Sequence, residues 1–297
     1  MNAVSDLTQT SRRGPSIAAR IAALDPEVSY EGIARLLYVY EFSWDIERAL
    51  EFALFRTYAV PSISGLLAKT GEFETRPRKR YDDTELILAE TIENGLDSAQ
   101  GKRSIARMNA MHGRFKIDNA DLLYVLSTFI CEPIRWLDRF GRRGMTENER
   151  RAWFLYYRGL GERMGIREMP DDLAGMMHLN EAYEAVHFRF ADTNHRIGAA
   201  TVDLLLSFYL PRRLVWIGRP AVRAFLDQPL LDSMGFRPAP GWLRHLLMAT
   251  LRMRAGVLKL LPRRRKPRRL TQMPRPTYPE GYKIEELGTF PVTKTGP

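Results

Sequence analysis

Apolar residues recur at intervals of three and four along most of this chain, which is the spacing of amphipathic α-helices. No stretch of useful length alternates apolar and polar residues as a half-buried strand does, and no segment is repeated. The runs with helical spacing cover residues 44–59, 102–111, 119–136, 147–164, 173–190 and 193–209. The pattern therefore predicts an all-α fold, built as a single multi-helix bundle.

Several short polar motifs predict where these helices begin and end. Thr146 and Glu149 form a T-x-x-E capping box before an apolar run, and Asn94-Gly95 is a typical stop. Side-chain oxygens that could cap helix N-termini follow at four further positions: Ser43, Asp82 or Asp83, and Asn119.

Composition changes along the chain and divides it into three expected parts. Residues 1–24 are expected to be a mobile tail, residues 25–226 the helical domain, and residues 227–297 a basic amphipathic helix with an extended tail. The helix expected at 242–261 is followed by a run of basic residues at 263–269. It could dock on the bundle, bind phosphate or lie on an anionic membrane surface. Nucleic acid is not expected, because no aromatic residues interrupt the basic run.

Charge and cysteine content restrict the environment. The formal net charge is +10 and the pI is about 9.8, which favours an anionic partner. The single cysteine, Cys131, excludes an internal disulfide and a zinc site with several thiolates. The N-terminus has no apolar secretory region, and no window reaches the length of a membrane-spanning helix. We expect a cytoplasmic protein, with peripheral membrane association left open.

One stretch, residues 78–136, holds more polar groups than an apolar bundle needs. In a helix over 102–111, Ile105, Met108 and His112 share one face, with Arg103 and Arg107 beside it. An interior imidazole near arginines suits an iron ligand in a pocket for an anionic cofactor such as haem. A core histidine bonded to a carbonyl group would show the same spacing.

Several segments of the chain resemble a known family. They read FSWDIERALEFALFRTYAVPSISGLLAKTGEF, KRYDDTELIL, ARMNAMHGRFKIDNADLLYVLSTFICEPIRW, ERMGIREMP and TYPEGYKIEELG. They are similar to the catalytic domain of the fungal mpaB-type oxygenases bound to the endoplasmic reticulum and, more remotely, to that of the rubber oxygenases called latex clearing proteins. The resemblance implies an all-helical oxygenase that uses O2 to cleave or oxidise an apolar alkene or isoprenoid substrate.

The resemblance also implies a cofactor and site residues. Rubber oxygenases carry haem b on an axial histidine, which we expect on the helix that matches 119–136. That helix has no histidine here, whereas His112 matches an earlier histidine that the branches share. His112 could therefore ligate iron, iron could be bound differently, or haem could be absent. The other positions in shared motifs are Arg80, Asp83, Arg107, Asn109 and Asn119.

The oxygenase hypothesis assigns roles to these positions. His112 binds the metal, Arg80 and Arg107 hold haem propionates or orient oxygen, and Asp83 or Tyr124 donates a hydrogen bond or carries a proton. The alternatives are a non-catalytic haem-binding or lipid-binding protein at the membrane surface, and non-haem iron on Glu184 and His187, which have E-x-x-H spacing.

Overall fold

The computed structural model describes residues 15–290 and shows an all-α protein within that range. The α-helices are α1 (Ile17–Ala22), α2 (Pro26–Leu36), α3 (Ser43–Thr57), α4 (Pro61–Thr70), α5 (Glu72–Thr75), α6 (Pro77–Asn94), α7 (Ala99–His112), α8 (Asn119–Phe140), α9 (Glu147–Arg163), α10 (Leu173–His187), α11 (Asp192–Ser207), α12 (Val215–Arg223), α13 (Gln228–Met234) and α14 (Gly241–Leu260). A π-helical segment, η2 (Leu37–Glu41), joins α2 to α3, and short 3-10 helices η3 (Arg212–Leu214), η4 (Leu270–Gln272) and η5 (Ile284–Glu286) lie in the connections.

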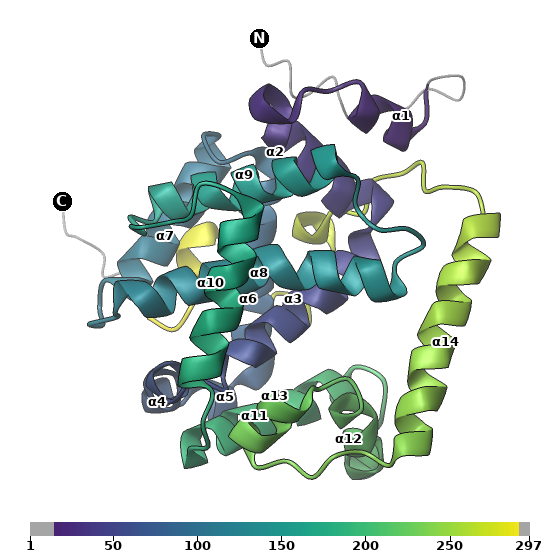
Figure 1. The fold of residues 1–297 in the computed structure, drawn as a ribbon. Coiled ribbons are helices and arrows are strands. Elements are labelled where there is room, and N and C mark those ends of the chain that lie inside the picture. The colour runs from purple at the N-terminus through teal and green to yellow at the C-terminus, as the bar shows by residue number, and fades with distance from the viewer. Residues whose placement is uncertain (1–14, 291–297) are drawn as a thin grey trace.

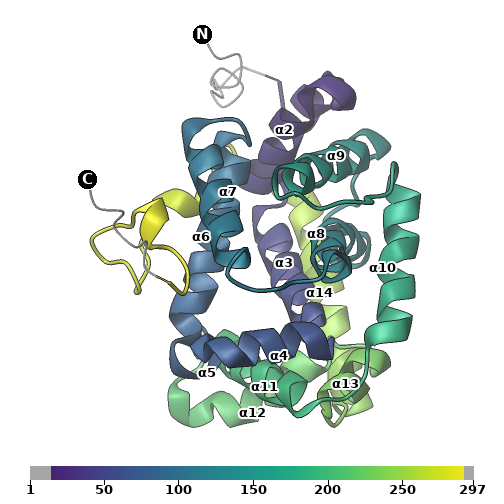
Figure 2. The same ribbon diagram turned by 90° about the vertical axis from the view of Figure 1, so that its left-hand side faces the viewer.

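Helix α8 is the centre of the bundle. It packs mainly against α3, α9 and α10, and Figure 2 shows it end-on with these helices around it. Ile130, Cys131 and Tyr124 of α8 are fully buried. The helix extends through Pro133 to Phe140, four residues beyond the expected end at Trp136. Buried residues cover most of the circumference of α8, as a central helix requires.

Of the three apolar clusters among the described residues, two hold most of the helices together. The larger one joins α2, α6, α7, α8 and α9, and the smaller one joins the end of α3 to α11 and α13. Figure 1 shows α11, α12 and α13 gathered below the main bundle, with α14 standing along one side. Met248 and Leu251 of α14 reach the bundle at Trp136 and Phe140.

The chain after α14 returns to the bundle and lies along α6 and α7 (Figure 2). Glu93 of α6 accepts hydrogen bonds from the Leu270 backbone (2.6 Å) and the Thr271 hydroxyl (2.7 Å). Asp82 accepts one from Thr277 at 2.6 Å. These contacts tie residues that are almost two hundred positions apart.

Some expectations at the chain ends and caps were wrong. Residues 1–24 are not all a mobile tail, because Ile17 and Ile21 of α1 are buried in the core; residues 1–14 lie outside the described part. Residues 227–297 include α13, which belongs to the smaller core, and α14, which contacts α8 and α12. Asp82 and Asp83 do not cap α6, which begins earlier, at Pro77.

Other caps depend on geometry at single residues. The capping box at Thr146 and Glu149 is confirmed, with both hydrogen bonds formed. Helix α6 ends at Asn94 before Gly95, whose φ of 98° suits glycine. Ser43 and Asn119 are the first helical residues of α3 and α8, so neither is the N-cap.

Candidate functional site

A largely apolar cavity of about 250 Å³ lies where α3, α4, α6, α7, α8 and α11 converge, and the tail at 288–290 closes one side. Leu122, Val125, Leu126 and Phe129 present one face of α8 to it, as helical spacing requires. Polar groups reach this cavity at a few points only. Those from α6 and α7 are Arg80, Tyr81, Asp83, Thr84 and His112.

His112 is the last residue of α7 and lines the cavity. Burial, and then the positive charge of Arg80, lower the pKa of His112 to about 4. Within residues 15–290 the imidazole has no hydrogen-bond partner. It is therefore a neutral base at pH 7, with a ring nitrogen available to a metal ion. The alternative of a core histidine bonded to a carbonyl group does not describe this side chain.

Arg80 differs from the two basic residues before it. Arg78 forms an ion pair with Asp82 (Nε–Oδ2, 3.0 Å) and Lys79 forms one with Asp83 (Nζ–Oδ2, 2.6 Å). Arg80 has no carboxylate partner in the described part of the chain; its Nη1 donates to the Thr84 hydroxyl, and its guanidinium lies 5.5 Å from the Phe73 ring centroid. Within the part of the chain that the structure describes, Arg80 is thus a cation at the cavity that forms no ion pair.

Hydroxyl residues also line the cavity, among them Thr84, Tyr58 and Thr201, to which the sequence analysis gave no role. Thr84 lies one helical turn after Arg80, a spacing that could have predicted the contact. Tyr58 and Thr201 both line the cavity, and burial raises the pKa of Tyr58 to about 12. No local pattern links these two residues, because Tyr58 follows α3 and Thr201 belongs to α11.

Carboxylic acids lie behind one wall of the cavity. Tyr81 lines the cavity and donates a hydrogen bond to Glu51 at 2.6 Å. Burial raises the pKa of Glu51 to about 8 and that of Glu85 to about 7. Glu51 also forms an ion pair with Arg48 (Oε1–Nη2, 2.9 Å), so Tyr81 joins the cavity wall to a buried network of charged groups.

The structure places other predicted site residues away from the cavity lining. Arg107 donates to the carbonyl oxygens of Leu287 (2.7 Å) and Phe290, so it holds the tail rather than facing the cavity. Asn109 donates to the Arg163 carbonyl oxygen (2.9 Å). Asn119 exchanges two hydrogen bonds with the Arg167 backbone.

Asp83 lines the cavity, but its carboxylate is already engaged. One oxygen accepts from Lys79 and the other from the Tyr278 hydroxyl. Lys79 also donates to the Gly288 carbonyl oxygen at 3.2 Å. The group joins α6 to the tail that closes the cavity.

Tyr124, Glu184 and His187 belong to a second polar network. Glu184 accepts from Tyr124 (3.0 Å) and pairs through both oxygens with Arg56, while His187 stacks on Tyr183 with ring centroids 4.0 Å apart. Both carboxylate oxygens of Glu184 are therefore used. Among residues 15–290, no three His, Cys, Asp or Glu side chains come together as a metal site.

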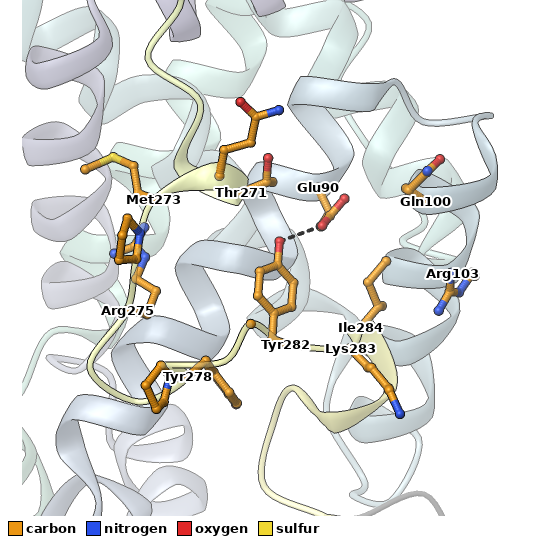
Figure 3. Close-up of a pocket in the computed structure, with 14 residues that line it drawn as sticks. Glu90, Gln100, Arg103, Thr271, Met273, Arg275, Tyr278, Tyr282, Lys283 and Ile284 are labelled. Carbon is orange, nitrogen blue, oxygen red and sulfur yellow. Dashed lines mark hydrogen bonds between the residues drawn. The ribbon is translucent and has the colours of Figure 1, made fainter.

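A second hollow, of about 530 Å³, lies between the tail and helices α6 and α7. Figure 3 shows its lining, with Tyr282 donating to Glu90 at 2.6 Å and Arg103 and Lys283 at its edge. It is an open groove with many charged groups. Its wall is mostly the tail itself, which the Tyr282–Glu90 bond fastens to α6.

Comparisons with known proteins show which family the chain resembles. Residues 52–256 match the family described as ER-bound oxygenase mpaB/B'/Rubber oxygenase, catalytic domain. The chain is 33% identical over 222 residues to "ER-bound oxygenase mpaB'" of Penicillium brevicompactum, covering 68% of this chain and 52% of the relative. It is 31% identical over 212 residues to "ER-bound oxygenase mpaB" of Penicillium roqueforti (strain FM164), covering 65% of this chain and 71% of the relative.

The similarity is thus concentrated in a catalytic domain, and the chain spans about half the length of the first of these relatives. Among the described residues, no helix has both the length and the hydrophobicity needed to cross a bilayer. The matched region, residues 52–256, contains His112, Arg80, Thr84 and the α8 wall of the cavity. The chain belongs to the mpaB and rubber oxygenase catalytic-domain family.

Proposed function

We propose that this protein is an oxygenase that binds iron as haem b in the His112 cavity and oxidises or cleaves an apolar alkene there. One observation carries the proposal. Among residues 15–290, the neutral imidazole of His112 has no hydrogen-bond partner and the guanidinium of Arg80 has no carboxylate partner, and both face the same apolar cavity. The membership in an oxygenase family supports the reaction class.

The residues present fit haem better than a metal held by protein ligands alone. Haem supplies four of its own iron ligands, so a single histidine is enough to hold it. Its propionates are anions, which suit the unneutralised charge of Arg80. Non-haem iron on Glu184 and His187 fits poorly, because Arg56 and Tyr124 already use the Glu184 carboxylate. When bound, haem would supply the binding and activation of O2.

The cavity walls suit a hydrocarbon substrate. Leucine, isoleucine, methionine, phenylalanine and other apolar side chains from several helices form most of the lining. Such walls exclude water and offer an alkene or isoprenoid chain an apolar environment. Tyr81 joins the cavity wall to Glu51, whose raised pKa suits a proton carrier. Arg80 and Thr84 can orient an anionic or oxygen-bearing group.

An absorption spectrum and iron analysis of the purified protein test the cofactor. We expect a Soret band and stoichiometric iron in the wild type and in His178→Ala, a matched control that removes an exposed histidine from α10. His112→Ala should lose both while it keeps a helical circular dichroism spectrum. Full iron and an unchanged Soret band in His112→Ala would contradict the assignment.

Oxygen uptake tests the reaction. Isoprenoid alkenes should consume O2 and yield oxidised products with the wild type, and not with His112→Ala. Haem binding without substrate-dependent uptake across a panel of isoprenoids would instead favour a non-catalytic haem-binding protein.

A further inference from the structure

Exposed apolar side chains gather on the outward face of α14. They follow one another at intervals of four, seven, four and three residues, which places them in one stripe along the 20-residue helix. A helix of this length is about 30 Å long. The members of the stripe and their exposed fractions are Trp242 (68%), Leu246 (55%), Met253 (67%), Val257 (51%) and Leu260 (87%).

The opposite face of α14 already holds the helix on the protein. Ala255 is buried, and Met248 and Leu251 pack against the bundle. Arg254 forms an ion pair with Asp45 (Nη1–Oδ1, 2.9 Å) and lies 3.8 Å from the Trp44 ring centroid. The sequence interpretation of a docked helix is therefore right for this face. The outward stripe remains without a partner among the described residues and adds nothing to the fold.

Charge is distributed unevenly around this helix. The segment between Asp232 and Glu280 contains twelve of the 45 Lys and Arg residues and none of the 35 Asp and Glu residues. The rest of the chain has 33 basic and 35 acidic residues, so this segment accounts for the basic character of the protein. The exposed basic residues of the segment that form no ion pair within the described chain are Arg237, Arg244, Arg252, Lys259, Arg264 and Lys266.

A second exposed group lies at the start of α14. Leu214 of η3 and Trp216 and Ile217 of α12 are exposed, beside the basic residues Arg212 and Arg213. Helix α12 contacts α14, and Figure 1 shows the two next to each other at the lower end of α14. Two of the five tryptophans, Trp216 and Trp242, are thus exposed in this region.

We propose that the outward face of α14, together with η3 and α12 at its N-terminal end, docks on an anionic lipid bilayer. A helix with an apolar stripe bordered by Lys and Arg lies in the interface, with its apolar side in the acyl boundary and its cations at the headgroups. Exposed indoles suit that boundary, where one edge is apolar and the other is wet. The inference does not depend on the cofactor or on the reaction in the cavity.

The same surface fits other partners less well. A second copy of the chain would bring two strongly basic faces together without an acidic residue on either, and like charges repel. Nucleic acid would use the cations but leave the apolar stripe in water. Only an anionic bilayer satisfies both properties of the face.

Vesicle flotation of the full protein tests the proposal, with vesicles of phosphatidylcholine alone or with phosphatidylserine. The triple variant Leu246→Ser, Met253→Ser and Val257→Ser removes the centre of the stripe. The variant Arg252→Gln, Lys259→Gln and Arg264→Gln removes three charges. Matched controls on distant helices are Val28→Ser for exposed apolar area and Lys69→Gln with Lys102→Gln for exposed charge.

We expect the wild type and the controls to bind only the vesicles that contain phosphatidylserine. The three-charge variant should bind on the order of 100-fold more weakly, at about fivefold per basic residue. The serine variant should lose binding while circular dichroism shows an unchanged helical content. Tryptophan emission of the wild type should shift to shorter wavelength on vesicles, and Trp242→Phe should reduce that shift.

Three results would overturn the proposal. Vesicle binding that is equal in the wild type and both triple variants would show that another surface binds lipid. Absence of binding to either vesicle by the folded wild type would exclude a lipid partner for this face. A wild-type dimer that becomes a monomer in the serine variant, as measured by light scattering, would assign the stripe to a second copy.

Discussion

His112 should make the stability of the cofactor-free protein depend on pH in a way that one substitution removes. An unfolded chain binds a proton on this histidine at its ordinary pKa of about 6.5, whereas the folded protein does so only near pH 4. Between these values the unfolded state holds more protons, so stability decreases as the pH falls. From pH 7 to pH 5 the loss that this one group causes is about 2 kcal/mol.

Other buried groups titrate in the same range, so the effect must be isolated by difference. The pKa of Glu85 is raised to about 7 and that of Glu51 to about 8, so each stabilises the fold at low pH and loses that contribution as the pH rises through its folded value. Their contribution is opposite in sign to that of His112. Because the His112 variant and its control both keep Glu51 and Glu85, the contribution of these two groups cancels when the two proteins are compared.

Urea denaturation at pH 7 and pH 5 measures the effect in protein prepared without haem. We compare His112→Gln with His178→Gln, which removes one exposed imidazole from α10. His178→Gln should lose about 2 kcal/mol more than His112→Gln on going from pH 7 to pH 5. Equal losses of unfolding free energy in the two variants would mean that the pKa of His112 is near its ordinary value. The description of His112 as a buried side chain beside Arg80 would then be refuted.

Three further predictions follow from side chains around the cavity and the helix ends. Arg80→Gln should raise the pKa of His112, measured by NMR titration, but leave it below 6.5, because burial is the larger cause; an unchanged pKa would place Arg80 too far away to matter. Arg107→Gln removes two hydrogen bonds to the tail, so it should lower the free energy of unfolding, measured with urea, by about 1–3 kcal/mol and speed proteolysis after residue 283. The control Arg103→Gln removes an exposed ion pair and should lower it by less than about 1 kcal/mol. Glu149→Ala breaks the capping box and the ion pair with Arg143, so it should lower the free energy of unfolding by about 2–4 kcal/mol. A loss no larger than that of Arg103→Gln would contradict this prediction.

The sequence alone determined the features that depend on neighbours along the chain. Helical spacing predicted the all-α fold and the interior direction of His112, because each turn of a helix fixes which residues share a face. The Thr146 capping box and the Asn94-Gly95 stop were predictable for the same reason. A cap and its partner are only three or four residues apart.

Only the tertiary structure decided which polar side chains face the cavity and which are used in hydrogen bonds to other parts of the chain. Arg80 and Arg107 are equivalent in sequence terms, yet one faces the cavity and the other holds the tail about 180 residues away. Asp83 finds Tyr278, and Tyr124 finds Glu184, through the packing of distant helices. Likewise, α14 is amphipathic on its own, but the bundle decides which of its apolar faces stays exposed. These choices depend on long-range contacts, for which a helical period carries no information.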